Sequence, residues 1–297
     1  FIGSHLVDRL IQEGHEVVVL DNLYSGKTEN LQSHLDKQSL RLIRGDVRNS
    51  KDVKEAVQGV DIIFHLAAIV NVALSIETPL LTNDVNVKGT LNLLEASINS
   101  KLQRFVYVST CAVYGEARYL PIDEEHPAMP LSPYAISKLA AESYCRVMYR
   151  THGLKTICLR FFNVYGSRQA GGPYGGVITR FVDRLKQGQT PIVFGDGDQT
   201  RDFVHVDDVV RACILASEDQ RCIGEVINIG TGKPTTIIKA AAVLTELLGK
   251  TGLKPEFSSS RVGDILHSYA DITKANSLIG FKPSATFEEG IQKLLSK

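Results

Sequence analysis

Short apolar runs alternate with longer amphipathic segments through most of this chain. The apolar runs are rich in valine, isoleucine and leucine and have the length of buried strands, whereas the segments between them repeat apolar residues every three or four positions, as helices do. Strands are predicted at 16–20, 40–43, 61–64, 104–108, 156–161 and 225–230. Helices are predicted before Gly14 and at 51–58, 80–99, 134–152, 177–188 and 209–217. This alternation predicts an α/β fold built on a doubly wound parallel sheet.

The first helix leads into a strand that ends at Asp21 and Asn22. A helix, a parallel strand and an acidic residue at its end form the second half of a dinucleotide-binding βαβ unit. The Asp21 carboxylate would bind the adenosine ribose and repel a 2′-phosphate, which favours NAD over NADP. The glycine-rich turn is then expected upstream, with Gly3 as its last glycine and roughly ten further residues, a strand and two glycines, before Phe1. Alternatively, Gly3 only permits helix packing and Asp21 only forms a turn.

Polar or small residues follow several predicted strands. Asp21, Asp46, Ala67 and Thr110 each stand at a carboxyl end of this kind. Ligands of doubly wound sheets bind along that edge, and the small residues after 61–64 would let a cofactor approach the backbone closely. The sequence therefore predicts one ligand site at the carboxyl ends of the strands.

A second candidate site opens the helix at 134–152. Ser132 is a suitable N-cap, and Pro133 fits the first turn. Tyr134 and Lys138 are four residues apart, so they share a helix face, where a nearby ammonium and the helix N-terminus would favour the phenolate form of the tyrosine. Such a phenolate could take a proton from an alcohol. Alternatively, the two are ordinary surface residues.

Composition narrows the function classes. The 297 residues carry 33 basic and 33 acidic side chains, so no strong field points to nucleic acid or to a membrane surface. No apolar run approaches the ~20 residues of a membrane span, and a cytoplasmic location is expected. The 5 cysteines form no Cys-x-x-Cys pair, and no metal site is expected. Asp207 and Asp208 are expected to cap the helix at 209–217 rather than to bind metal.

Several motifs occur in a characteristic order. They are Asp21-Asn22-Leu23, Gly45-Asp46-Val47, His65-Leu66-Ala67-Ala68, Asn86-Val87-Lys88-Gly89-Thr90, Ser109 to Gly115, and Tyr134-x-x-x-Lys138. In this order the chain resembles the extended short-chain dehydrogenase/reductases of the NAD-dependent epimerase/dehydratase family, and the UDP-glucose 4-epimerases most of all. The resemblance implies an NAD-binding Rossmann domain at 1–163. It also implies a smaller C-terminal substrate-binding α/β lobe at 164–297, of which about 203–232 returns to the first domain.

The resemblance implies an isomerase that interconverts UDP-glucose and UDP-galactose through a 4-keto intermediate with bound NAD. Thr110, Tyr134 and Lys138 would be its catalytic residues. His65 is expected to be structural. Where the related 4,6-dehydratases carry acidic residues after the catalytic threonine, this chain has Cys111 and Ala112, so the acid pair for dehydration is missing.

Binding residues follow from the same resemblance. The NAD site would be lined by Phe1, Ile2, Gly3, Asp21, Asn22, Ser25, Gly26, Asp46, Val47, Leu66, Ala67, Ala68, Asn86, Tyr134, Lys138 and Phe162. The nucleotide sugar would contact Thr110, Asn163, Val177, Arg201, Arg261, Asp264 and Ser268, with both arginines on the diphosphate. Ser268 stands where some relatives carry a tyrosine that walls off the C2 substituent, so its small size predicts room for an N-acetyl group.

Other functions stay open. The same fold serves UDP-glucuronate epimerases and decarboxylases, 4-keto reductases and non-catalytic NAD-binding regulators, although intact Thr110, Tyr134 and Lys138 favour an enzyme. The resemblance also implies a homodimer that packs through helices at about 84–99 and 134–152. Those helices could equally be buried within one chain.

Overall fold

The computed structural model describes residues 1–172, 175–260 and 265–296. Two compact units interleave along the chain. The first comprises 1–113, 130–160 and 210–227, and the second comprises 114–129, 161–209 and 228–297. The domain boundary predicted at residue 163 stays a prediction.

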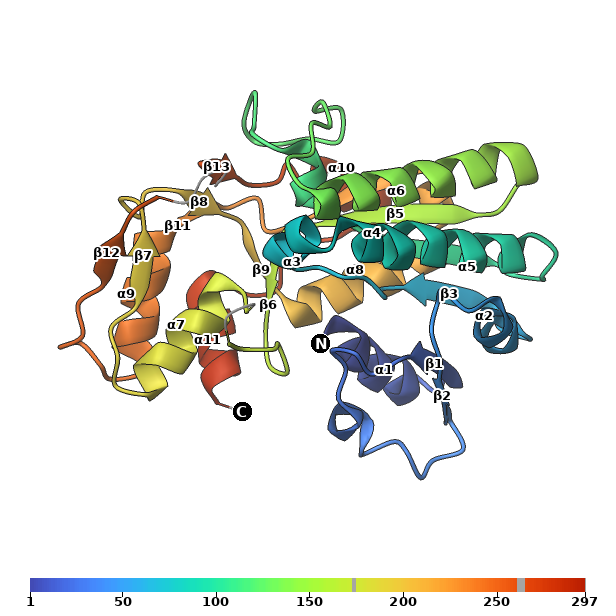
Figure 1. Cartoon of the computed structure of the whole chain (residues 1–297), viewed down its shortest axis with the longest axis horizontal. Helices are drawn as coiled ribbons and strands as arrows, with labels where there is room; N and C mark the ends of the chain where they lie inside the picture. Colours follow the sequence, from blue (N-terminus) through green and yellow to red (C-terminus); the bar gives the residue numbers. More distant parts are fainter. Residues whose placement is uncertain (173–174, 261–264, 297) are drawn as a thin grey trace. The chain divides into compact units, whose positions relative to one another are not determined.

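Parallel strands form the centre of the first unit (Figure 1). Strand β1 (Val17–Asp21) pairs in parallel with β2 (Leu40–Arg44), and β3 (Ile62–His65) pairs in parallel with β4 (Arg104–Thr110). Strands β10 (Val226–Ile229), β5 (Thr156–Phe161), β4 and β3 lie in that order in one sheet. Every residue of β4 and β5 is buried, as in a sheet covered on both faces. The predicted α/β fold with a parallel sheet is confirmed.

Amphipathic helices pack around these strands. They are α1 (Ile2–Gln12), α2 (Ser50–Val57), α3 (Val72–Glu77), α4 (Pro79–Asn83), α5 (Gly89–Ile98), α6 (Pro133–His152) and α8 (Val206–Glu218). The apolar faces of α2, α5 and α6 meet the sheet in a core that includes Leu94, Phe105 and Tyr107, each at most 1% exposed, and α1 contributes Val7 to a second core beside β1 and β2. Helices α4, α5 and α6 lie side by side (Figure 1). This packing places the start of α6 near the end of β4.

The second unit combines short strands with helices. Its strands are β6 (Asn163–Tyr165), β7 (Ile192–Phe194), β8 (Thr200–Arg201), β9 (Phe203–His205), β11 (Thr235–Thr236), β12 (Glu256–Ser258) and β13 (His267–Ser268). Its helices are α7 (Val177–Lys186), α9 (Ile237–Leu247), α10 (Thr273–Ile279) and α11 (Phe287–Leu295). A core around Phe181, Leu185 and Leu244 joins α7, α9 and α11.

Two predicted helices differ from the observed ones. The helix expected at 80–99 is interrupted, because residues Asp84–Lys88 form a π-helical turn between α4 and α5. The helix expected at 209–217 begins three residues earlier, at Val206. Asp207 and Asp208 therefore lie inside its first turn and do not precede it, and both carboxylate oxygens of Asp208 accept from the backbone N–H of Ser284, at 3.0 and 3.1 Å.

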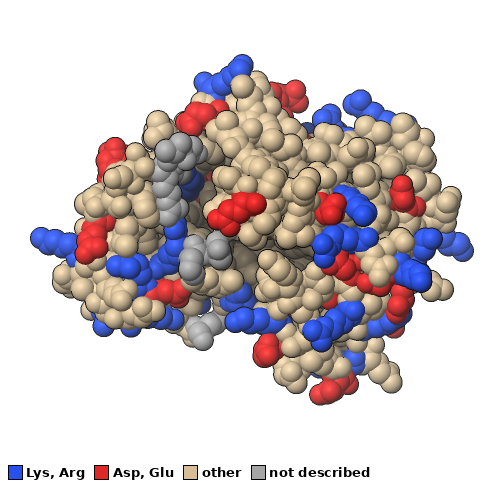
Figure 2. All heavy atoms as spheres, in the orientation of Figure 1, with Lys and Arg blue, Asp and Glu red and all other residues tan. Residues whose placement is uncertain are grey.

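Charges of both signs are mixed on the visible face of the molecule (Figure 2). On the face shown in Figure 2, lysines and arginines lie among aspartates and glutamates. Within the described ranges, no helix combines the length and the apolarity that crossing a bilayer requires.

Candidate active site

Helix α6 begins where the sequence predicts. The Ser132 side chain accepts a hydrogen bond from the backbone N–H of Ala135 at 3.2 Å, and Pro133 occupies the first turn. The far end stops at Gly153, whose positive φ of 68° suits glycine. The Ser132 cap fixes the first turn, and the helical period places Tyr134 and Lys138 on one face of α6.

The Thr110 hydroxyl lies close enough to the Tyr134 phenol to act on its pKa. Thr110 is the last residue of β4, and its hydroxyl also accepts from the backbone N–H of Ala112 at 3.2 Å. Burial raises the pKa of Tyr134 to about 12, and Thr110 acts in the opposite direction. The expected shift toward phenolate is therefore wrong for the protein alone, because burial of the phenol outweighs the effect of Thr110.

Lys138 lies deeper than Tyr134, with 3% of its surface exposed. Its ammonium stands 4.3 Å from the centre of the Tyr107 ring, a cation–π contact, and the Tyr107 hydroxyl donates to the backbone carbonyl of Lys138 at 3.3 Å. Burial lowers the pKa of Lys138 to about 8. Lys138 therefore sits close to the point where a small change of field alters its protonation at neutral pH.

His65 is not built for proton transfer. It is buried, and its Nε2 lies 2.9 Å from the Thr90 hydroxyl, which itself donates to the Asn86 carbonyl at 2.6 Å. Burial, with a smaller contribution from Lys138, lowers the pKa of His65 to about 3. The imidazole is neutral at ordinary pH, in line with the expected structural role.

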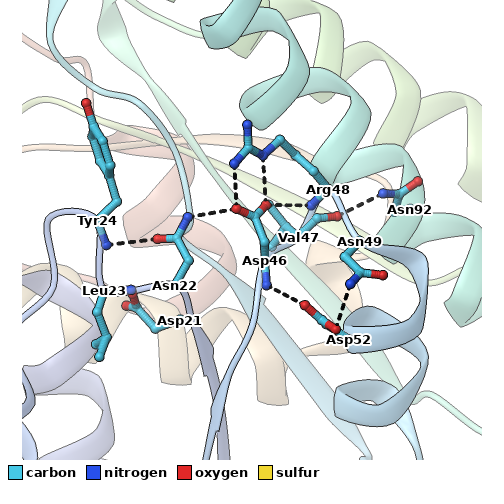
Figure 3. A network of polar contacts seen from close by, with 10 residues as sticks. All are labelled: Asp21, Asn22, Leu23, Tyr24, Asp46, Val47, Arg48, Asn49, Asp52 and Asn92. Atoms are coloured by element: carbon cyan, nitrogen blue, oxygen red, sulfur yellow. Dashed lines mark hydrogen bonds and ion pairs between the residues drawn. The ribbon is translucent and has the colours of Figure 1, made fainter.

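The residues after β1 and β2 form a connected polar network (Figure 3). Asn22 Nδ2 donates to Asp46 Oδ2 at 2.8 Å. Arg48 clamps the same carboxylate: its Nε donates to Oδ1 at 2.9 Å and its Nη2 to Oδ2 at 2.8 Å. The Arg48 guanidinium holds the pKa of Asp46 well below its usual range. Arg48 was not among the predicted residues, although a basic residue two positions after a strand-end aspartate could have suggested it.

Asp21 accepts the backbone N–H of Leu23 at 2.7 Å, which orients its carboxylate (Figure 3). A Cβ at Gly26 would lie 3.1 Å from both Asp21 oxygens, so only glycine leaves that carboxylate open on this side. A Cβ at Gly3 would meet nothing within 4 Å, which does not support helix packing as the reason for that glycine. An open, oriented carboxylate at the end of β1 fits the ribose of a dinucleotide.

Asn86 lies in the π-helical turn and is 1% exposed. Its side chain accepts from the backbone N–H of Ile69 at 2.8 Å and donates to the Ile69 carbonyl at 3.0 Å and to Ser137 Oγ at 2.9 Å. Asn86 therefore ties the segment after β3 to α6 between Tyr134 and Lys138. Its side-chain bonds serve to position that segment.

The remaining predicted cofactor residues divide between the units. Phe1, Ile2 and Gly3 open α1, Ser25 is exposed in the loop after β1, Val47 follows Asp46, and Leu66, Ala67 and Ala68 follow β3. A Cβ at Gly89 would come 2.6 Å from Val47 Cγ2, so glycine at 89 lets α5 pack against this segment. Phe162 belongs to the second unit, where it is buried and its N–H donates to the Ile229 carbonyl at 3.0 Å.

Two predicted substrate residues meet on neighbouring strands of the second unit. Arg201 in β8 stands opposite Ser268 in β13, and Ser268 is 5% exposed. Asn163 opens β6, while Val177 opens α7 and packs on the core that contains Phe181. Arg261 and Asp264 lie outside the described residues.

A buried carboxylate that the sequence pattern did not predict holds these strands. Asp202 is 0% exposed and accepts from the N–H groups of Thr231 (2.7 Å), Gly232 (2.9 Å) and Ala270 (3.1 Å). It stands between Arg201 and β9, so it fixes the backbone on which Arg201 is carried. Asp202 lies in a polar, charged stretch without hydrophobic periodicity, so the sequence pattern could not predict that its side chain is buried.

A family model described as "NAD dependent epimerase/dehydratase family" matches residues 1–230. The chain belongs to this family. It is 37% identical to a UDP-glucose 4-epimerase of Mycolicibacterium smegmatis, with 99% of this chain and 94% of that protein covered. Among solved structures, it is similar to a UDP-glucose 4-epimerase of Thermotoga maritima with UDP-glucose (38% identity, TM-score 0.93) and to a UDP-N-acetylglucosamine 4-epimerase of Methanobrevibacter ruminantium (36%, TM-score 0.94). Each covers 100% of this chain and 94% of its own.

Membership confirms three predictions. The protein is an enzyme of the NAD-dependent epimerase/dehydratase family, its fold is the Rossmann fold, and its cofactor is NAD. Asp21 with Gly26 and the clamped Asp46 are the features in this chain that fit the cofactor's adenosine end. The roles of the individual site residues stay predictions.

Proposed function

We propose that the enzyme is a nucleotide-sugar 4-epimerase that interconverts UDP-glucose and UDP-galactose through a transient 4-keto sugar. The observation that carries the proposal is that the Thr110 hydroxyl, at the end of β4, acts on the Tyr134 phenol, with Lys138 one turn along the same helix face. The names of the relatives at 37% and 38% identity support the same activity.

In this proposal Tyr134 is the base that removes the O4 proton, and Thr110 orients that hydroxyl toward the phenol. When bound, oxidised NAD supplies a positive charge and accepts hydrogen from C4 as hydride. Lys138 provides a second positive charge near the phenol, which favours release of the tyrosine proton. The three side chains thus hold and move one proton at O4.

The diphosphate would be anchored in the second unit. Arg201 offers a planar guanidinium that can pair with phosphate oxygens, and the family resemblance adds Arg261. Epimerisation requires the 4-keto sugar to present its opposite face while the nucleotide stays bound, so anchoring through the diphosphate is the expected arrangement. Because no net oxidation occurs, the cofactor has to stay on the enzyme between turnovers.

Related activities are the alternatives. A UDP-glucuronic acid 4-epimerase structure at 33% identity and a UDP-N-acetyl-alpha-D-glucosaminuronate decarboxylase at 32% also resemble the chain. Cys111 and Ala112 leave no carboxylate directly after Thr110, which argues against dehydration. A regulator without activity would not need the Thr110–Tyr134 pair.

One experiment separates these candidates. The full-length protein is incubated with UDP-glucose, UDP-N-acetylglucosamine and UDP-glucuronate in parallel, and products are resolved by chromatography. We expect C4 epimers of the first two, since the small Ser268 leaves space beside C2 for the N-acetyl group. We expect no pentose product from UDP-glucuronate. Ser268→Tyr should abolish only the N-acetyl reaction. Carbon dioxide release from UDP-glucuronate, or no C4 epimer from UDP-glucose, would contradict the proposal.

We also propose a homodimer. Large exposed apolar side chains gather on helices that pack together in the first unit: Val72 (45% exposed), Ile76 (63%), Leu80 (83%), Ile136 (55%) and Val147 (50%). None of the large exposed apolar side chains in the described chain falls in 84–99, so the proposed contact uses α3, α4 and α6. A cytoplasmic location stays a prediction.

A further inference from the structure

A buried ion pair lies one turn beyond Lys138. Glu142 on α6 is 1% exposed and Arg160 on β5 is 5% exposed. Arg160 Nε donates to Glu142 Oε2 at 3.0 Å, and Nη2 donates to Oε1 at 2.6 Å. Ser109 Oγ donates to Oε2 at 2.7 Å. Both oxygens of one carboxylate are therefore bonded, and they connect β4, β5 and α6.

Two of these partners are close in sequence to the proposed catalytic residues. Ser109 immediately precedes Thr110, the residue whose hydroxyl acts on the Tyr134 phenol. Glu142 follows Lys138 by four residues, so both lie on one helix face. The bonds of Glu142 thus hold the strand end that carries Thr110 against the helix that carries Tyr134 and Lys138.

Stability alone is a weak reason for such a pair. Burying two charges costs desolvation that their attraction barely offsets, and apolar side chains of similar volume often fold as well. A negative charge at this place has a local consequence, however. Lys138 is buried and makes no ion pair with any residue that the structure describes, and Glu142 is the carboxylate next along its helix face.

We propose that Glu142 is a positioning residue of the active site: through Ser109 and Arg160 it fixes Thr110 relative to Tyr134, and its charge stabilises the Lys138 ammonium. This inference rests on the proposed epimerase function. It assigns Glu142 no contact with substrate or cofactor.

The charge effect has a defined sign. Burial lowers the pKa of Lys138 to about 8, whereas Cys145 and Glu142 act to raise it. Three further titratable groups interact with Lys138: Cys158 also acts to raise its pKa, Tyr107 lies under the ammonium, and His65 has its own pKa lowered by Lys138. Glu142→Gln removes the negative charge and leaves the positive charge of Arg160, so Lys138 should lose its proton at lower pH.

The test compares kcat, KM and their pH profiles for wild type, Glu142→Gln and a control. The control is Thr156→Val, which removes a buried 2.8 Å bond from β5 to the Cys145 carbonyl on α6 without touching Glu142. For Glu142→Gln we expect kcat to fall about 10- to 100-fold, KM to stay within about twofold, and the alkaline limb of kcat to move to lower pH. Thr156→Val should lower Tm and leave kcat and the pH profile unchanged.

Ser109→Ala separates geometry from charge, and it decides the question if Glu142→Gln does not fold. It keeps the Glu142 charge, so kcat should fall about 5- to 10-fold with no movement of the alkaline limb. A wild type without turnover would refute the proposed function itself. An active wild type, combined with Glu142→Gln at wild-type kcat and pH profile or with Ser109→Ala at wild-type kcat, would overturn the inference.

Discussion

Burial sets the protonation of the central side chains. It raises the pKa of Tyr134 to about 12, lowers that of Lys138 to about 8 and lowers that of His65 to about 3. Tyr134 and Lys138 are therefore poised for a change of field when a charged ligand binds, whereas His65 is locked in its neutral form. Side-chain spacing predicted which residues share a face, but not these pKa values, since burial depends on residues far away in sequence.

His65 gives a pH prediction. A base whose folded pKa lies below its unfolded value takes up protons on unfolding, so stability is lost as pH falls from about 6.5 toward 3. At pH 5 the loss should be about 2 kcal/mol relative to pH 8. His65→Gln, which can still bond Thr90 but does not titrate, should lack this loss. Urea unfolding of both proteins at pH 5 and 8 checks it, and equal pH dependence would contradict it.

The elements follow the sequence pattern closely where a periodic segment is unbroken. Strand β5 and the start of α6 lie where the apolar run and the Ser-Pro signal predicted them. The π-helical turn at 84–88 could not be predicted, because its extra residue is stabilised by Asn86 bonding Ile69 and Ser137, which are distant in sequence. The Glu142–Arg160 pair and the buried Asp202 were not predicted for the same reason, since their hydrogen-bond partners are distant in sequence.

Asn86 tests this view of the π-helical turn. Asn86→Leu should destabilise the protein by about 2 kcal/mol, since it leaves the buried N–H and C=O of Ile69 without their side-chain partner. Bound NAD should fall as well, because the segment after β3 loses its anchor. Asn83→Ala, at an exposed asparagine just before the turn, is the matched control and should change neither quantity. Chemical unfolding and NAD content after purification measure both effects. Wild-type stability in Asn86→Leu would show that the turn forms without this clamp.

The fold of the whole molecule was predictable from the sequence, whereas the surface of the proposed dimer was not. Alternating strands and helices indicated the parallel α/β fold, and ordered motifs indicated the family. Both signals could be recognised because each strand, helix or motif is a contiguous stretch of sequence. The surface proposed for the dimer could not be predicted in this way. Exposed apolar side chains on α3, α4 and α6 become visible only once packing shows which faces are left uncovered.

The homodimer is tested by placing a charge on that face. The wild type should sediment at twice the chain mass of 32.6 kDa. Val147→Glu should raise the dimer dissociation constant at least about tenfold, because it would bury a charge in an apolar contact. Phe257→Glu, at a residue 59% exposed in the second unit, is the control and should remain dimeric. A monomeric wild type or a dimeric Val147→Glu at low concentration would refute the proposed interface.

The most direct measurement follows the hydrogen at C4. The full-length enzyme, without added NAD, is given UDP-glucose labelled with deuterium at C4, and the UDP-galactose formed is examined by mass spectrometry and NMR. We expect the deuterium to remain at C4. Tyr134→Phe should slow the reaction by roughly 10²- to 10⁴-fold while NAD stays bound. Loss of the label to solvent, a requirement for stoichiometric added NAD, or near-normal turnover by Tyr134→Phe would contradict a 4-epimerase that works through Tyr134.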